Sequence, residues 1–234
     1  NYMRNDSIVV YAMDLPGHGL SGSRRGTIKS NEEILDDIDS MIYIIEKDNP
    51  GSRKYLMGVS MGGIYATAYA IHDSVSPHLS GMILAGAALK VQRSQIIRID
   101  NLFYISHWLF NRHVPVVNLD GKRLESSTTD QNYINTRRND SLSVHRVSID
   151  YLLKVHEMQR ECKKKSLLTK VHLPVLILHG EQDRISSLKG SRFLNRNLSN
   201  GKPELIVYPG CRHSIFWDTD SFTAVRDIVR WISE

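Results

Sequence analysis

The sequence predicts an α/β fold in which a mostly parallel sheet is covered by helices on both faces. Short apolar runs recur along the chain, and most of them lead into a Gly-containing turn and then a helical pattern. Strands that alternate with helices favour parallel pairing, because each helix returns the chain to the starting edge of the sheet. With 234 residues, of which 41% are hydrophobic, the chain is long enough for one sizeable core.

Five runs are predicted as strands because they are short, apolar and followed by turn residues. They are Ser7 to Ala12, Lys54 to Val59, Gly81 to Leu89, Val175 to Leu178 and Glu204 to Tyr208.

Three helical patterns accompany these strands, and the first is the clearest. Ser30 and Glu33 form a capping-box pattern, and Asn49-Pro50-Gly51 ends the helix. The other two helices run from about Gly62 to Ile71 and from Asp220 to Ile232. One face of the first helix carries Ile34, Leu35, Ile38, Met41, Ile42 and Ile45.

Residues 90–170 do not follow the alternation of strands and helices. Ile96 to Phe110 is apolar on nearly every side, and Ser148 to Lys165 reads as a basic amphipathic helix. The stretch between them is polar and turn-rich, with few strand signals. We therefore predict a core of residues 1–89 and 171–234, with a helical insertion of residues 90–170 between two core strands.

Composition excludes several classes of protein. No apolar run approaches the ~18 residues that a membrane span requires, and the first residues lack the apolar segment of a signal peptide. Cys162 and Cys211 cannot form a disulfide framework, and no Cys/His spacing resembles a zinc site. We expect a reducing, cytoplasmic location and no bound metal.

The positive charge is concentrated in the middle of the chain. Residues 90–170 hold 15 Lys and Arg against 8 Asp and Glu, within a net charge of +5 for the whole chain. Such a segment either faces an anionic partner or is a solvated basic surface. No nucleic-acid reading motif accompanies it, so no nucleic-acid partner is predicted.

Gly58-Val59-Ser60-Met61-Gly62 is a G-x-S-x-G motif placed between a predicted strand and a predicted helix. A sharp strand-to-helix turn needs small residues around its centre, and it exposes the Ser60 hydroxyl above the sheet edge. The Met61 N–H, at the start of the helix, can then donate to a developing oxyanion.

A serine nucleophile requires a base, and the base requires an orienting acid. Asp183 follows the strand Val175 to Leu178, and His213 follows the strand Glu204 to Tyr208. The chain order Ser60, Asp183, His213 is the order of an α/β-hydrolase triad. These three residues are the predicted catalytic set.

Other acids and histidines are weaker candidates. Glu181 lies in the same turn as Asp183 and is the second choice for the acid. Asp218 and Asp220 are interpreted as N-cap residues of the last helix. His18 is expected to be structural in its turn, and His179 to pack at the end of its strand.

At these motifs the sequence resembles the monoacylglycerol lipase and lysophospholipase-like branch of the α/β-hydrolases. Val59 stands where the family usually has His, and Ser141 where it usually has Pro. The matching segments are Asp14 to Ser21 (D-x-x-G-H-G-x-S), Gly58 to Gly63 (G-H-S-M-G-G), Arg138 to Leu142 (N-D-P-L), Gly180 to Asp183 and Gly210 to His213.

The resemblance implies a serine ester hydrolase that needs no cofactor. It implies that Ser60 is the nucleophile, Asp183 the acid and His213 the base, with a lipid ester such as a monoacylglycerol or lysophospholipid as substrate. Residues 90–170 then form a helical cap over the acyl pocket. Phe103 and Trp108 are the predicted substrate contacts, and the apolar stretch that holds them either lines this pocket and touches a membrane or is buried between neighbours.

The family also has a front hairpin, a further strand and an H-G loop before the segment at Ser7 to Ala12, and the H-G loop supplies a second oxyanion donor. None of these is present in the 234 residues, and residue 1 is not Met. We therefore expect the functional protein to have residues upstream of Asn1.

Two other functions remain open from the sequence. One is a general carboxylesterase, thioesterase or small-peptide hydrolase on the same scaffold, since a fold does not determine the substrate. The other is a non-catalytic interaction protein. Acyl chain length, head group and oligomeric state are not indicated by any pattern.

Overall fold

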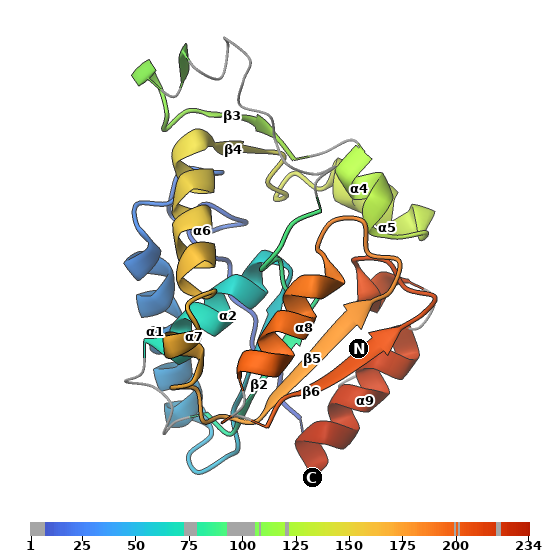
Figure 1. Ribbon diagram of the computed structural model, residues 1–234. Helices are drawn as coiled ribbons and strands as arrows, with labels where there is room; N and C mark the ends of the chain where they lie inside the picture. The colour runs from blue at the N-terminus through green and yellow to red at the C-terminus, as the bar shows by residue number, and fades with distance from the viewer. Residues whose placement is uncertain are drawn as a thin grey trace.

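The computed structural model describes residues 8–72, 79–92, 106–107, 109–119, 122–198, 200, 202–218 and 221–234. Within these ranges the chain forms a strand-and-helix core with a long segment inserted between two core strands (Figure 1). In chain order the elements are α1 (Asn31–Asp48), β1 (Tyr55–Val59), α2 (Met61–Ile71), β2 (Gly81–Ala85), β3 (Pro115–Asn118), α4 (Lys122–Ser127), α5 (Gln131–Asn139), β4 (Arg146–Ser148), α6 (Ile149–Glu161), α7 (Lys165–Leu168), β5 (Val175–Gly180), α8 (Leu188–Asn197), β6 (Glu204–Tyr208), η4 (Ile215–Trp217) and α9 (Ser221–Ser233).

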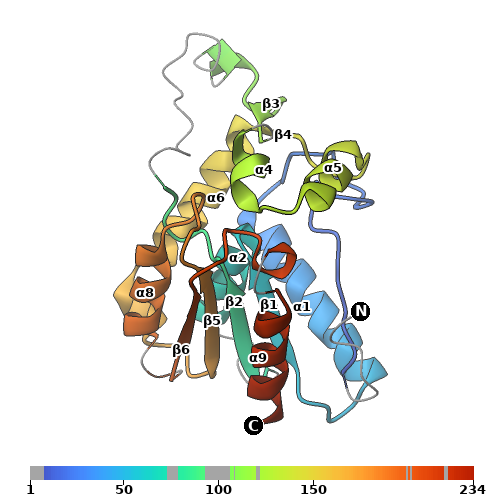
Figure 2. The same cartoon turned by 90° about the vertical axis from the view of Figure 1, so that its right-hand side faces the viewer.

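The core sheet has four strands in the order β1-β2-β5-β6, and all of its pairs are parallel. Side chains of β2 alternate between its two faces: Leu84 belongs to the cluster that holds α2 and α8, and Ile83 to the cluster under α9. Figure 2 shows α9 on one side of the sheet and α2 on the other. The predicted parallel sheet flanked by helices is confirmed.

Helix α1 follows its sequence pattern closely. It begins after Ser30, whose hydroxyl accepts a hydrogen bond from the Glu33 N–H, and Asn49 caps its end. In a usual capping box the Glu33 carboxylate would accept from the N–H of the N-cap residue, Ser30. Here it accepts from the N–H of Lys29, one residue earlier. Ile34, Ile38 and Ile42 form the buried face of the helix.

The first predicted strand is wrong over residues 8–12. These residues have no strand assignment, and Val9 and Val10 are exposed. A strand requires a hydrogen-bonding neighbour, and among the described residues none pairs with this segment. The chain reaches the core only after this segment, where Met13 and Leu15 pack against the buried cluster.

The segment between β2 and β5 contains strands as well as helices. β3 and β4 form a two-stranded antiparallel sheet, although the sequence of this region shows few strand signals. Val117 and Val147 are both buried in this pair. The Ser148 N–H also donates to the Gly26 carbonyl at 2.9 Å, so β4 is anchored by a loop far away in sequence. The inserted segment is therefore mainly helical but also contains a short two-stranded sheet that the sequence did not predict.

None of the helices in the described part of the chain combines the length and apolar character that crossing a bilayer requires.

Candidate active site

Ser60 lies at a sharp turn between β1 and α2. Its backbone has φ 55° and ψ −112°, a conformation that L-residues rarely adopt and that strained functional turns preserve. The surrounding backbone holds this conformation: the Ser60 N–H donates to the Ala85 carbonyl at 2.9 Å, and the Ala88 N–H donates to the Ser60 carbonyl at 2.9 Å. The G-x-S-x-G motif therefore forms the sharp strand-to-helix turn that it predicts, with Ser60 at its centre.

Two glycines make this turn possible, and only one of them belongs to the G-x-S-x-G pattern. A Cβ on Gly58 would lie 2.3 Å from the Gly62 carbonyl oxygen, and a Cβ on Gly63 would lie 2.7 Å from the Ala87 Cβ. A Cβ on Gly62 would meet nothing within 4 Å. The small residues that the turn requires are thus Gly58 and Gly63.

Asp183 is held in the turn that follows β5. Its Oδ1 accepts hydrogen bonds from the N–H groups of Ile185 (2.7 Å) and Ser186 (2.9 Å), and its Oδ2 accepts from the Ser186 hydroxyl at 2.5 Å. The segment after β2 supports this turn, because the Gln92 side-chain amide donates to the Asp183 carbonyl at 3.2 Å. The carboxylate is buried, so its direction is determined by these contacts.

His213 lies in the loop after β6, residues 209–218, which we call the histidine loop. The loop passes so close to the end of β5 that a Cβ on Gly180 would lie 2.2 Å from the Arg212 carbonyl oxygen. Gly86, at φ 55°, leaves the space beside the imidazole, since a Cβ there would lie 3.4 Å from His213 Nδ1. Gly180 lets the loop after β6 approach the end of β5, and Gly86 leaves room for the His213 ring.

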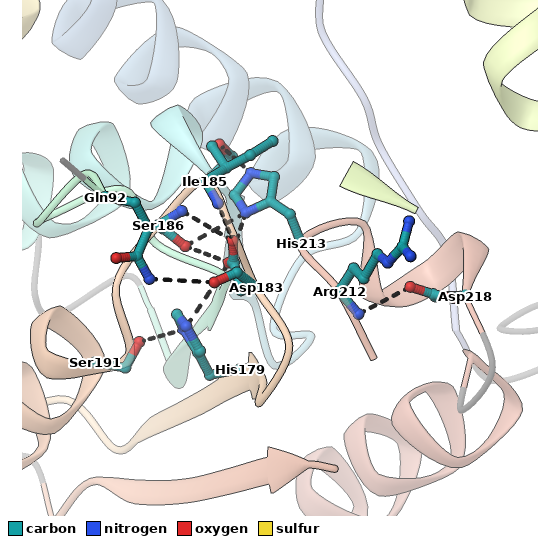
Figure 3. A network of polar contacts seen from close by, with 10 residues as sticks. Gln92, His179, Asp183, Ile185, Ser186, Ser191, Arg212, His213 and Asp218 are labelled. Carbon is teal, nitrogen blue, oxygen red and sulfur yellow. Dashed lines mark hydrogen bonds and ion pairs between the residues drawn. The ribbon is translucent and has the colours of Figure 1, made fainter. Parts of the chain in front are cut away.

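The three predicted residues form one continuous hydrogen-bonded chain. His213 Nε2 lies 2.8 Å from Ser60 Oγ, and His213 Nδ1 lies 2.7 Å from Asp183 Oδ2. Figure 3 shows the Asp183 carboxylate between Ser186 and the His213 ring. Glu181, the second choice for the acid, is exposed and contacts the end of β6 through its N–H.

Electrostatics keep the Asp183 carboxyl ionised. Burial by itself raises the pKa of this group, but the His213 ring and the hydrogen bonds from Ser186 and Ile185 outweigh it and hold the pKa below its ordinary value. An ionised carboxylate accepts but cannot donate, so His213 Nδ1 carries the hydrogen in their shared bond. His213 Nε2 is then left as an acceptor for the Ser60 hydroxyl.

His179 is buried at the end of β5, as the sequence predicts, and it also contacts the site. Its Nδ1 lies 2.8 Å from the Ser191 hydroxyl, and its Nε2 lies 3.7 Å from Asp183 Oδ2. Burial lowers the pKa of His179 to about 4, although the charge of Asp183 raises it. The ring is therefore neutral at neutral pH.

The described contacts of the Asp218 side chain are not with the last helix, so its interpretation as an N-cap is not confirmed. Helix α9 begins at Ser221, whose N–H donates to the Asp218 carbonyl. The Asp218 carboxylate instead accepts from the Arg212 N–H at 2.8 Å and from the Thr129 hydroxyl at 2.6 Å. Asp220 lies outside the described residues.

Comparison with known proteins places this geometry in a family. A family model described as serine aminopeptidase, S33, matches residues 1–220. The chain belongs to the serine aminopeptidase S33 family. The resemblance to monoacylglycerol lipases and lysophospholipase-like enzymes of the α/β-hydrolase fold is confirmed by relatives and solved structures.

Several relatives match this S33-family chain over most of its length. The monoacylglycerol lipase of Mycolicibacterium smegmatis is 25% identical over 228 residues, 96% of this chain and 78% of the relative. A phospholipase of Bacillus subtilis is 27% identical over 186 residues, 78% of this chain and 68% of the relative. The crystal structure of Paleococcus ferrophilus monoacylglycerol lipase has a TM-score of 0.80 and 25% identity, covering 95% of this chain and 82% of its own.

Other predicted residues of this S33-family chain have mixed outcomes. Met61 is the first residue of α2, where the N–H has no partner inside the helix, and its side chain accepts from the buried Tyr151 hydroxyl at 3.2 Å. His18 lies in a turn and its Nδ1 lies 3.1 Å from the Pro16 carbonyl oxygen. Phe103 and Trp108, the predicted substrate contacts, lie outside the described residues.

Sequence reasoning missed the residues that support the triad. Ser186, three positions after Asp183, has the spacing of a side-chain-capped turn, and this pattern could have indicated it. Gly86 has no local signal beyond its place after a strand. In the described ranges no three or more His, Cys, Asp and Glu side chains are grouped to hold a metal ion.

Proposed function

We propose that the chain hydrolyses the acyl ester of a lipid such as a monoacylglycerol or a lysophospholipid through an acyl-enzyme on Ser60. One observation carries the proposal: Ser60, His213 and Asp183 form an unbroken hydrogen-bonded chain in a protein similar over 96% of its length to a monoacylglycerol lipase. No step in this reaction calls for a metal or an organic cofactor.

In the proposed mechanism His213 Nε2 takes the Ser60 proton while Ser60 Oγ attacks the acyl carbonyl. The Asp183 carboxylate holds the Nδ1–H tautomer and stabilises the imidazolium that forms. The Met61 N–H, at the positive end of α2, donates to the oxyanion. His213 then protonates the leaving alcohol, and water attacks the acyl-enzyme to release the fatty acid.

The inserted segment is proposed to act as a cap over the acyl pocket. Figures 1 and 2 show α4, α5, β3 and β4 together above the core, beyond the arrowhead ends of the core strands. The Ser214 N–H, next to His213, donates to the Ser127 carbonyl at the end of α4, so the segment reaches the edge of the site. A cap in this position excludes water and selects the acyl group.

We further propose that the cap contacts a membrane surface. Leu109 and Phe110 lie in the inserted segment and are exposed, and Phe110 retains 81% of its accessible surface. Helix α6 begins directly after β4 and is about 20 Å long. The basic run Lys163 to Lys165 follows its other end, away from β4. The proposed contact therefore rests on Leu109 and Phe110 and not on these lysines.

The first test is labelling with a fluorophosphonate probe followed by peptide mass spectrometry. We expect a single adduct, on Ser60, in the wild-type protein and in Ser52→Ala, a control in the turn after α1. Ser60→Ala should carry no adduct, and its ester hydrolysis should fall by at least about 10⁴-fold. A folded wild-type protein that takes no label would instead favour the non-catalytic interaction protein.

Substrate class is tested with a panel of acyl esters, thioesters and short peptides. A lipid esterase should prefer long-chain monoacylglycerols over short soluble esters in kcat/KM, because a longer acyl chain buries more apolar surface. The matched family, serine aminopeptidase S33, favours small peptides as the second candidate substrate class. Faster cleavage of peptides than of any ester would reverse the order of the two proposals.

A further inference from the structure

The backbone N–H groups of the residues before and after His213 have specific partners. The Arg212 N–H donates to Asp218 Oδ2 at 2.8 Å, and the Ser214 N–H donates to the Ser127 carbonyl at 2.7 Å. The first partner belongs to the histidine loop itself and the second to the segment inserted between β2 and β5. The backbone that carries the base is therefore held from both directions, and Figure 3 shows the bond between Arg212 and Asp218.

Asp218 joins these two directions. While its Oδ2 accepts from the Arg212 N–H, its Oδ1 accepts from the Thr129 hydroxyl at 2.6 Å. Thr129 belongs to residues 127–130, which we call the α4–α5 connector. The Asp218 side chain is buried, so exchanging these partners for water is unfavourable.

Further contacts join the same two segments. The Arg212 guanidinium donates to the Thr128 carbonyl at 3.1 Å, and the Thr128 hydroxyl donates to the Trp217 carbonyl. The Trp217 ring stacks on Tyr133 of α5, with ring centroids 4.8 Å apart. The connector and the histidine loop thus form one packed unit, in which Asp218 bonds both to the Arg212 N–H and to Thr129 of the connector.

We infer that Asp218 is a positioning residue that keeps His213 within reach of Ser60 by fastening the histidine loop to the α4–α5 connector. The inference rests on the proposed serine-hydrolase function and says what holds its base in place. Because the connector belongs to the inserted segment, the position of the base depends on the docking of that segment. The proposed effect of Asp218 on the reaction passes through His213.

The decisive variants are Asp218→Ala and Asp218→Asn. Alanine removes both hydrogen bonds. Asparagine retains them without the charge, because its carbonyl oxygen can accept from the Arg212 N–H and its amide can donate to the Thr129 hydroxyl. We expect Asp218→Ala to lower kcat on a short soluble ester and the rate of fluorophosphonate labelling by about 10–100-fold, with KM unchanged within about twofold. Asp218→Asn should restore both rates to within about threefold of wild type.

Two further variants separate positioning from general stability. Thr129→Val removes the hydrogen bond to Asp218 Oδ1 but leaves the bond between Asp218 and the Arg212 N–H. We expect it to lower kcat by a smaller factor, about 3–10-fold. Asp227→Ala is the matched control: Asp227 is a largely buried carboxylate on α9 that accepts from the Tyr208 hydroxyl at 3.0 Å and pairs with Arg230 on the same helix. Its kcat should stay within about twofold of wild type.

Hydrogen–deuterium exchange gives a readout that does not depend on activity. Peptides covering residues 209–218 should exchange faster in Asp218→Ala than in wild type, and peptides from β5 should not change. Unchanged protection of this loop, or a kcat loss no greater than that of Asp227→Ala, would overturn the inference. If wild type takes no label while Asp218→Ala loses protection, the proposed function fails and the role of Asp218 in holding the loop stands.

Discussion

At the scale of single residues, the negative charge of Asp183 is not offset by a positive charge on the neighbouring His179. His179 faces Asp183 Oδ2 at 3.7 Å, close enough to neutralise the carboxylate if the ring were protonated. Burial keeps that ring neutral by lowering its pKa to about 4. The negative charge of Asp183 is therefore available to the imidazolium that forms on His213 during the reaction.

This arrangement predicts a specific loss of stability in mild acid. The pKa of His179 in the folded protein lies below the ordinary histidine value of about 6.5. Between about pH 6.5 and about pH 4 the unfolded chain binds a proton that the folded chain does not, so stability falls as the pH drops through this window. On going from about pH 7 to about pH 5, wild type should lose about 2 kcal/mol more than His179→Gln.

Urea denaturation at the two pH values measures this difference. The control is His172→Gln, which replaces an exposed histidine just before β5. Its loss of stability between the two pH values should equal that of the wild type. If His179→Gln loses as much stability as wild type, the folded protein protonates His179 and its ring is not neutral in mild acid.

At the scale of elements, the site forms where three strands end. Ser60 follows β1, Asp183 follows β5 and His213 follows β6, and parallel pairing places these three ends at one edge of the sheet. The short connections allow the loops to meet only where side chains are absent. Gly58 and Gly180 are such positions, since a Cβ at either would lie less than 2.5 Å from a carbonyl oxygen.

Two substitutions within the elbow should have opposite effects on stability. Gly58→Ala places a methyl group against backbone, and we expect it to lower the free energy of unfolding by at least about 2 kcal/mol. Gly62→Ala enters open space on the first turn of α2 and should raise this free energy by about 0.5 kcal/mol, because alanine favours the helix. Urea midpoints of the two variants test the pair, and equal losses would contradict the steric account.

At the scale of the whole molecule, the inserted segment contacts the core at more than one place. The α4–α5 connector bonds to the histidine loop, and β4 bonds to the Gly26 loop through the Ser148 N–H. Tyr151 of α6 also reaches the side chain of Met61, the residue after Ser60. The segment that is proposed to select the acyl group is thus physically linked to the groups that are proposed to cleave it.

The proposed membrane contact predicts a selective loss of vesicle binding. Phe110→Ser removes an apolar side chain that is 81% exposed on the inserted segment, and it should weaken binding to phosphatidylcholine vesicles by about tenfold. Tyr43→Ser, at a 71% exposed position on α1, is the control and should bind as wild type does. Sedimentation with vesicles measures both, and equal binding by Phe110→Ser and wild type would remove the basis for the contact.

Local sequence signals were sufficient for the parts of the molecule that depend on near neighbours. The capping and apolar spacing of α1, the strand–turn–helix around Ser60 and the chain order of Ser60, Asp183 and His213 are all readable without a structure. Periodicity, glycine and proline act within a few residues of chain, so their consequences appear in the sequence itself.

Tertiary structure decided the features that depend on distant partners. Residues 8–12 look like a strand, but a strand also needs a neighbour, and none of the described residues provides one. β3 exists because Arg146–Ser148 pairs with it, and Asp218 bonds to Thr129 because the inserted segment folds back over the histidine loop. Hydrogen bonds between segments almost ninety residues apart leave no periodic trace in the chain, so only the folded molecule reveals them.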